Sequence, residues 1–531
     1  MEKIYEKIVQ FDLAAYINTR IKKADKLFWC AFFASFIALN LIFIYHGAAF
    51  LFGDHDWKYL KNGISLNAGL FEGRFSQFIL INLLSQGEIL PIVNNVLGFT
   101  FFSLGVAGLG RYWLLPQNKR SWIIFALFTA VTPYILSFMY FAFIVAPVLS
   151  WNAFIVAALL ISERESKFSF LKSASSILLI TLALGGYPAV INLIATAFAV
   201  RLLIAVCHEK SSFREVFKRY KWTVINIILG IIVYKICLII LTKTGAINSD
   251  YYNLQTTPFK EWGSKFLLIC KDLFLEFTTT LPFIGAPYKA AISIISLLGL
   301  VIILKGQKSR RMIGILLFLA VFLAGMITLF LSTSIRETEF SPRIDFFGFM
   351  YGISGILAFI LKSEHKIIKN LSYLIATYCI IINAHTLFEA QKVWKLGFDA
   401  ELSLYKRVGQ RFQTDEMFNQ YGHYIIVQSG MPTLRKRFYH DRYRRSSDDL
   451  LDISYVPTMA SGVMWNYYGI YEYADSTSYA YTFRPDADFI EKLQNAQAYP
   501  KEGSVAVGGY WILLLMNNDG LAALRNYYLH N

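Results

Sequence analysis

Long apolar runs separated by short polar segments occupy the first 387 residues of the chain. A helix needs about 20 apolar residues to cross the hydrocarbon core of a bilayer. Eleven runs approach this length, and we interpret each of them as a membrane-spanning helix. The predicted spans are Leu27–Phe52, Ile89–Tyr112, Trp122–Leu136, Phe141–Ile161, Ala174–Gly186, Ala189–Val206, Trp222–Leu241, Ala290–Leu304, Ile313–Leu331, Phe346–Leu361 and Leu371–Leu387.

Charged residues between these runs indicate how the chain is threaded through the membrane. The first segment, Met1–Lys26, is polar and basic, so we expect an amphipathic surface segment followed by an uncleaved helix, without a signal peptide. Basic loops stay in the cytoplasm, which places the N-terminus inside and, after eleven spans, the C-terminus outside. The basic loops are Arg111–Arg120, Arg164–Lys172, Lys210–Lys221, Lys305–Arg311 and Lys362–Lys369.

The composition changes after Leu387, and the rest of the chain is expected to form a second domain. It is polar, rich in Tyr, and has no run long enough to span a bilayer. Alternating apolar stretches at Tyr424–Val427 and Val505–Leu515 predict strands, and Ala400–Phe412 predicts an amphipathic helix. The expected organisation is a mainly α membrane domain, residues 1–388, followed by a small extracytoplasmic α/β domain, residues 389–531.

Composition agrees with a membrane protein and excludes several other classes. Hydrophobic residues make up 56% of the chain and charged residues 16%, which disfavours a disordered chain or a coiled coil. The net charge of +15 comes mostly from the basic loops, so it does not indicate nucleic-acid binding. A basic cluster from Leu434 to Arg445 is either a solvated surface or a site for anionic lipid or polysaccharide. The five cysteines form no CxxC or CxxH pair, so neither structural zinc nor a disulfide framework is predicted.

Two carboxylates open the first outer loop, residues 53–88, in the sequence Gly53-Asp54-His55-Asp56-Trp57. Paired carboxylates at a membrane surface act as a general base, bind a metal ion or cap a helix. Adjacent residues do not easily face one ion, so a divalent metal at Asp54 and Asp56 is the less favoured alternative, and no cofactor is expected.

An interfacial helix is predicted later in the same loop. Apolar residues at helical spacing run from Leu66 to Ile79, and Glu72-Gly73-Arg74 lies among them. Glycine permits close approach of a ligand, and Arg74 is either a phosphate contact or an arginine that extends its charge to the membrane surface.

Arginines also occur in the last long outer loop, where the membrane orientation rule disfavours them. Arg336 and Arg343 flank Glu337 in this loop. They either bind an anionic ligand at the outer leaflet or pair with neighbouring glutamates. Lys235 lies toward the outer end of its predicted span. Its side chain either extends to the membrane surface or projects into the cavity that would hold this anionic ligand.

Together these features resemble the GT-C class of membrane glycosyltransferases. More narrowly, Gly53-Asp54-His55-Asp56-Trp57 and Glu72-Gly73-Arg74-Phe75-Ser76 look like motifs of the Gtr-type bacterial O-antigen glucosyltransferases, the serotype-converting enzymes. The resemblance implies a GT-C-like bundle in the bacterial inner membrane with its active site facing the periplasm, and the apolar runs give this bundle about eleven helices. It covers the membrane portion, and we find no motif of the family in the C-terminal domain.

The resemblance also implies a reaction and its partners. The donor would be a sugar, usually glucose, on undecaprenyl or another polyprenyl phosphate, and the acceptor O-antigen or lipopolysaccharide. A flippase and a donor-synthesising enzyme would be partners. The family's acidic residues correspond to Asp54 and Asp56, one of which would be the base. The residues expected to contact substrate are Trp57, Glu72, Arg74, Lys235, Arg336, Glu337 and Arg343, with the arginines on the donor phosphate.

Three other functions stay open at this point. A related enzyme would transfer another sugar, such as aminoarabinose or mannose, or modify lipid A. A non-enzymatic lipid or polysaccharide flippase needs a polar path, but no predicted span has Asp or Glu near its centre. A scaffold that binds surface polymer through its C-terminal domain leaves the first-loop carboxylates unexplained.

Overall fold

A computed structural model gives the architecture of most of the chain. It describes residues 26–51, 56, 60, 63–65, 70, 73–139, 141–142, 144–163, 169–247, 259–280, 283–328, 346–419, 421–430, 472–474 and 483–529. The predicted amphipathic segment Met1–Lys26 lies almost wholly outside these residues, and the basic cluster from Leu434 to Arg445 lies wholly outside them.

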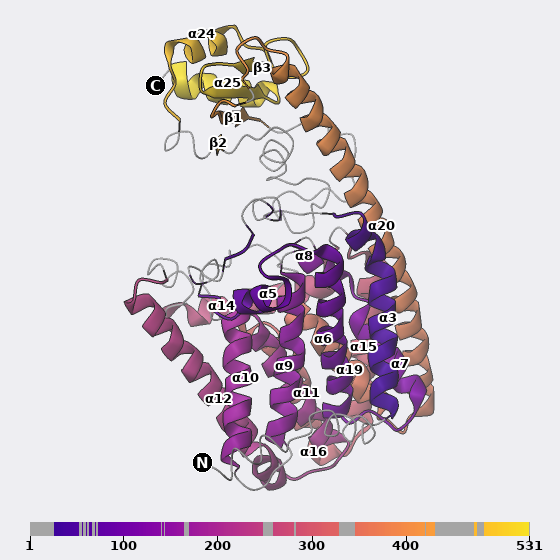
Figure 1. Ribbon diagram of the computed structural model, residues 1–531. Helices are drawn as coiled ribbons and strands as arrows, with labels where there is room; N and C mark the ends of the chain where they lie inside the picture. Colours follow the sequence, from indigo (N-terminus) through magenta and orange to yellow (C-terminus); the bar gives the residue numbers. More distant parts are fainter. Residues whose placement is uncertain are drawn as a thin grey trace, which may run out of the picture.

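Helices packed side by side form a bundle, as Figure 1 shows. Along the chain the bundle contains α3 (Lys26–Ala48), α5 (Gln77–Ser85), α6 (Pro91–Tyr112), α7 (Lys119–Ala130), η1 (Pro133–Ile135), α8 (Leu136–Met139), α9 (Val145–Glu163), α10 (Phe170–Gly186), α11 (Val190–Cys207), α12 (Phe213–Lys243), η2 (Phe259–Glu261), α14 (Trp262–Thr278), α15 (Ala286–Lys305), α16 (Lys308–Ala324), α19 (Phe349–Leu361) and α20 (Lys366–Gln413).

Each of the eleven predicted spans overlaps a helix of the bundle. Within the described residues, seven helices are long and apolar enough to cross a membrane, or eight if α7 and the following η1–α8 form one bent span. The remaining three predicted spans correspond to α10, α16 and α19, which have 17, 17 and 13 residues. The mainly helical membrane fold is therefore confirmed, and the count of eleven spans stays a prediction.

The breaks between helices occur where local sequence opposes a longer helix. Pro133 starts a short 3-10 turn, and the two parts of that bent pair meet at 41°. Gly185 and Gly186 end α10 where large rings pack against the backbone. A Cβ atom on Gly185 would come within 2.3 Å of the Phe75 ring, and one on Gly186 within 2.0 Å of Trp151. Glycine is needed here because of this close packing.

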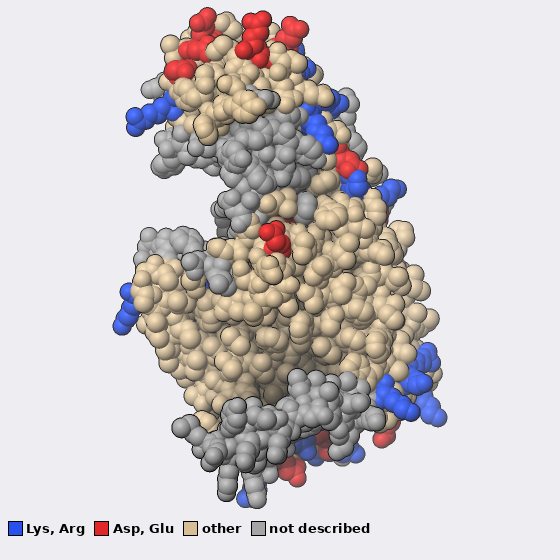
Figure 2. Space-filling view, viewed as in Figure 1, with Lys and Arg blue, Asp and Glu red and all other residues tan. Residues whose placement is uncertain are grey.

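Charged and apolar side chains are separated along the length of the bundle. On the face shown in Figure 2, the described Lys, Arg, Asp and Glu residues lie mainly toward the two ends of the molecule, and the band between them is mostly uncharged. Large apolar side chains are exposed on the bundle, among them Leu83 at 74% and Leu374 at 68%. A broad apolar surface between polar ends is typical of helices that face lipid.

The C-terminal residues form a separate mixed sheet. Helix α20 has 48 residues and runs without a break through residue 388, where the composition changes, so the predicted helix Ala400–Phe412 is its last part. It extends from the bundle to the sheet (Figure 1). The strands are β1 (Ile425–Ser429), β2 (Glu472–Ala474), β3 (Val505–Val507) and β4 (Trp511–Leu515), in the order β2-β1-β4-β3.

Strand β1 pairs in parallel with β2 and β4, and β3 pairs antiparallel with β4. Helices α24 (Ala487–Asn495) and α25 (Asn518–Leu529) complete this unit. Phe489, Leu493 and Trp511 are buried in its core. Arg411, in the last turn of α20, donates hydrogen bonds to the carbonyl oxygens of Pro500 and Lys501 and so joins the helix to the sheet unit.

Candidate functional site

The segment between α7 and α9, residues 131–144, contains in its described part only the short helices η1 and α8. It is the centre of the site and is called here the α7–α9 break. Backbone groups inside a membrane domain need partners, because lipid supplies none. Side chains from distant elements provide them. Asn383 donates to the carbonyl oxygen of Val131 at 2.9 Å, and Asn94 donates to that of Ala142 at 3.1 Å. The break is therefore a buried structure held by specific polar contacts.

Asp56 is one of these partners. Its side chain is 0% exposed, and its Oδ2 atom accepts a hydrogen bond from the backbone N–H of Ala142 at 3.1 Å. Ala142 follows α8, which lies at the end of the bundle nearer the C-terminal sheet (Figure 1). The structure thus places one of the two predicted carboxylates inside the protein, oriented by a backbone donor. Asp54 and Trp57 lie outside the described residues.

His46, near the end of α3, joins the break to two further helices. Its Nε2 atom lies 3.0 Å from the carbonyl oxygen of Met139, and its Nδ1 lies 3.0 Å from the side-chain nitrogen of Asn95. A carbonyl only accepts, so Nε2 carries the proton and Nδ1 accepts from the amide. The backbone N–H of His46 donates to Gln391 of α20 at 3.1 Å. Both ring nitrogens are engaged, which makes His46 a structural residue rather than a proton carrier.

Arg74 is linked to the break through an aromatic ring. Its guanidinium carbon is 5.4 Å from the centroid of the Tyr187 ring, a cation–π distance. Tyr187 in turn contacts Phe138 of α8, with ring centroids 5.8 Å apart. The segment that carries Arg74 is tied to the end of α10, because the N–H of Ser76 donates to the carbonyl oxygen of Gly185 at 3.0 Å. Asp56 therefore contacts the break directly, and Arg74 is linked to it through the Tyr187 ring.

Lys235 belongs to α12, which packs against the segment around Arg74. The Tyr234 ring is 6.3 Å from that of Phe75, and a Cβ atom on Gly73 would lie 3.0 Å from Leu238. Gly73 has a positive φ of 72°, which favours glycine at this close approach. The Lys235 side chain is half-buried on this helix. The structure thus brings the helix of Lys235 next to the Arg74 segment.

A buried ion pair is the main feature that sequence reasoning missed. Lys289 of α15 places its Nζ 3.0 Å from Oε2 of Glu276 in α14, and the Tyr134 hydroxyl donates to the same oxygen at 2.6 Å. Lys289 is 3% exposed, Glu276 1% and Tyr134 0%. Tyr134 belongs to the α7–α9 break, so this cluster lies at the site as well. Within the described residues, Oε1 of Glu276 has no hydrogen-bond partner.

A signal for this pair was present in the sequence. Residues 242–289 lie between the predicted spans Trp222–Leu241 and Ala290–Leu304, outside any predicted helix, but α14 forms within them. Its buried residues are Lys265, Ile269 and Glu276, spaced four and seven positions apart. That spacing is one face of a helix, and charged residues on a buried face indicate buried partners. Reading the segment as a helix would have singled out Glu276.

Several predicted site residues are not described by the structure. Glu72, Arg336, Glu337 and Arg343 lie outside the described residues, so their positions relative to Asp56 remain predictions. In the described part of the chain, no group of three or more His, Cys, Asp or Glu side chains is placed to hold a metal ion.

Comparison with known proteins identifies the family. A family model described as glucosyl transferase GtrII matches residues 60–359, which include Arg74, the α7–α9 break and the Glu276–Lys289 pair. Searches of curated proteins and of solved structures found no match. The family match covers more than half of the 531 residues. The chain therefore belongs to the glucosyl transferase GtrII family.

Proposed function

We propose that the protein transfers glucose from a polyprenyl-phosphate donor to O-antigen or lipopolysaccharide at the periplasmic face of the bacterial inner membrane. Membership of a glucosyl transferase family supports glycosyl transfer. The Asp-His-Asp and Glu-Gly-Arg motifs, which look like those of the O-antigen enzymes, support this donor and acceptor. The observation that carries the proposal is the buried Asp56 carboxylate, oriented by Ala142 at the same segment that Arg74 approaches through Tyr187.

This arrangement suits attack by a sugar hydroxyl on an anomeric carbon. Asp56 or Asp54 takes the proton of the attacking hydroxyl as its oxygen forms the new glycosidic bond. The bond between the anomeric carbon and the phosphate oxygen breaks, and its electron pair leaves with the polyprenyl phosphate. That leaving group is already an anion, so it needs cationic partners rather than a general acid. In the proposal Arg74, Arg336 and Arg343 supply them, and Lys235 is a weaker candidate.

The direct test is transfer by the purified full-length protein. The assay offers polyprenyl-phosphate glucose with a labelled sugar and lipid-linked O-antigen, and it measures label in the acceptor. Transfer of glucose in preference to mannose or aminoarabinose from the same carrier is expected. Absence of transfer with every donor, together with movement of the lipid across vesicle membranes, would instead identify a flippase.

The orientation of the chain has its own test. Basic residues at helix starts and in the link after α11, such as Arg120, Lys369 and Lys210, suit a cytoplasmic location for that end of the bundle. Helix α20 begins there at Lys366 and ends at the C-terminal sheet. Reporter fusions after Lys369 and after Asn531 are therefore expected on opposite sides of the membrane. Reporters on one side would require a different number of spans.

Donor binding is expected to depend on the guanidinium of Arg74. Its planar group engages two phosphate oxygens at once, whereas lysine offers a single point charge. Arg74→Lys should weaken binding of polyprenyl phosphate by a few-fold, and Arg74→Ala by about tenfold or more, the effect of one lost charged hydrogen bond. Lipid-phosphate binding by purified protein measures both.

The control for this experiment is Tyr187→Leu, which removes the ring under Arg74 but leaves the arginine. If Arg74 serves only to pack on Tyr187, then Arg74→Ala and Tyr187→Leu will lower stability alike and leave donor affinity unchanged in the folded protein. That outcome would exclude Arg74 from phosphate binding.

A further inference from the structure

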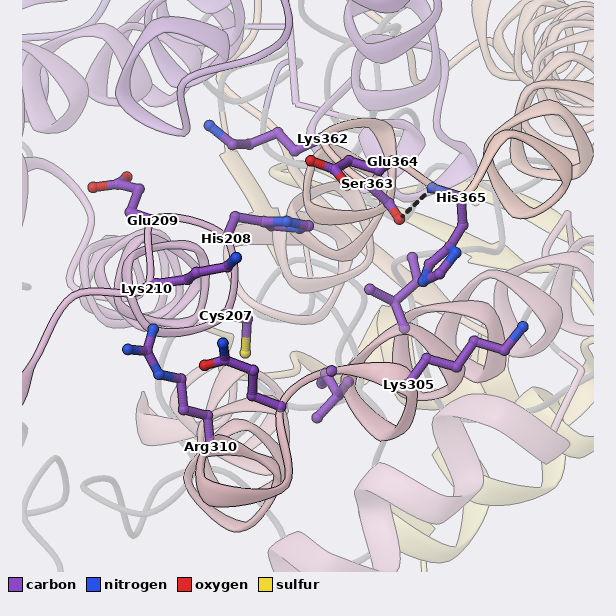
Figure 3. Close-up of a pocket in the computed structure, with 14 residues that line it drawn as sticks. Cys207, His208, Glu209, Lys210, Lys305, Arg310, Lys362, Ser363, Glu364 and His365 are labelled. Carbon is purple, nitrogen blue, oxygen red and sulfur yellow. Dashed lines mark hydrogen bonds between the residues drawn. The ribbon is translucent and has the colours of Figure 1, made fainter.

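A cavity of about 450 Å³, drawn in close-up in Figure 3, is separate from the site described above. The helix ends that line it lie at the end of the bundle opposite α8 (Figure 1). It is formed by the ends of α11 and α15, the start of α16, and the link from α19 to α20. The proposed transfer reaction makes no use of it.

Cationic side chains predominate around this cavity, which we call the basic pocket. Lys210, Lys305, Arg310 and Lys362 line it, together with two carboxylates, Glu209 and Glu364. Figure 3 shows Lys210 and Arg310 on one side of the pocket and Lys305 on the other.

The negative charge of Glu209 is already matched by other residues. Arg201 contacts it at 2.5 Å, and Arg219 forms a second ion pair with it. Neither arginine lines the pocket. Burial lowers the pKa of His208, also in the lining, to about 4, so this imidazole adds no charge at neutral pH. The charge of the pocket therefore comes from its lysines and Arg310.

Among the described residues, none of these four cations is within ion-pair distance of a carboxylate. Lys362 donates to the carbonyl oxygen of Leu114 at 2.9 Å, and Arg310 to that of Val206 at 3.3 Å. Lys210 and Lys305 form no hydrogen bond or ion pair with any residue that the structure describes. Glu364 offsets only one of the four cations that line this cavity, so the lining keeps a surplus of positive charge, which favours an anionic ligand.

The surroundings of the pocket indicate which kind of molecule bears the anionic group. Residues just before α16 and α20 line it, and backbone N–H groups at helix starts favour negative charge. Beside it, large apolar side chains face outward: Ile367 is 84% exposed, Met312 68% and Ile313 48%. A ligand with a charged head and apolar tails satisfies both surfaces.

We infer that the basic pocket binds the phosphate of an anionic lipid headgroup, with the acyl chains lying along α16 and α20. Phosphate esters are shared by lipids and soluble metabolites, and the exposed apolar side chains beside the pocket favour the lipid. A bound lipid would hold α11, α15, α16 and α20 together at this end of the bundle. Basic pockets between membrane helices are suited to such headgroups.

The test compares two double variants that remove equal charge. Lys210→Gln/Arg310→Gln removes two pocket cations. Lys308→Gln/Arg311→Gln removes two cations at the start of α16 that do not line the pocket. Full-length proteins in neutral detergent are titrated with phosphatidylglycerol, phosphatidylcholine and inorganic phosphate, and bound lipid is counted by native mass spectrometry. Wild type should bind phosphatidylglycerol best, and the pocket variant should lose about tenfold in affinity, whereas the control should not.

Other outcomes are equally informative. Equal losses in the two double variants would overturn the proposal, because they would mean diffuse attraction to surface charge. Binding of inorganic phosphate that depends on the pocket, without binding of phosphatidylglycerol, would overturn the lipid assignment in favour of a soluble phosphate ester. If the pocket variant does not fold, Lys305→Gln replaces it, since this side chain is exposed. Unchanged lipid affinity in that variant would count against the pocket.

Discussion

Replacing Asp56 by asparagine is expected to reduce sugar transfer by a factor of about 100 to 10,000 in a protein that still folds. Asparagine has nearly the same shape, and its side-chain oxygen accepts the N–H of Ala142 as the aspartate does at 3.1 Å. The α7–α9 break therefore keeps its contact. What is lost is the negative charge and the ability to take a proton from the acceptor hydroxyl. Transfer by purified protein, normalised to folded protein, measures the effect.

Two further variants separate catalysis from structure at this position. Asp56→Ala removes the contact with Ala142 as well as the base, so it should lower both activity and thermal stability. Asp54→Asn shows which of the two carboxylates is the base. If Asp56 serves only to hold the break, Asp56→Asn will retain full activity and only Asp56→Ala will be impaired. Full activity in both asparagine variants and in their double variant would remove the aspartates from the mechanism.

Breaking the Glu276–Lys289 pair should have the largest effect on stability. Removing one partner of a buried ion pair leaves the other charge buried without compensation, which costs about 3–5 kcal/mol. Glu276→Gln and Lys289→Met are each expected to lower the unfolding temperature markedly. The double variant Glu276→Gln/Lys289→Met leaves no buried charge from the pair, so it should recover much of the loss. Thermal unfolding of detergent-purified protein gives all three values.

Asp272→Asn is the matched control for this experiment. It removes a carboxylate from the same helix, one turn before Glu276, where the side chain is only half-buried. Its unfolding temperature should stay close to that of wild type. Additive losses in the double variant would show that Glu276 and Lys289 act independently. Normal stability with lost transfer activity in Glu276→Gln would show instead that Glu276 serves the reaction.

The sequence alone determined the membrane character, the approximate helices and the family. Hydrophobic length acts locally, so the apolar runs could be located without a structure, including the separation of Ala174–Gly186 from Ala189–Val206. The motifs around Asp56 and Arg74 likewise pointed to a Gtr-type glucosyltransferase, and the family match confirms that resemblance. These features depend on residues close together in the chain.

Tertiary structure decided which distant residues meet. Asp56 contacts a backbone N–H 86 positions away, and Tyr134 meets Glu276 across 142 positions. No local pattern in the sequence specifies such pairs. The paired residues are far apart in the chain and meet only because the helices that carry them pack together in the folded bundle. The length of α20, which continues to Gln413, is also decided by tertiary structure. A helix continues through a change of composition when its first part packs in the bundle and its last part packs against the sheet unit. The helical spacing of α14 could single out Glu276, but its pairing with Lys289 is decided by the folded bundle, in which both side chains are buried together.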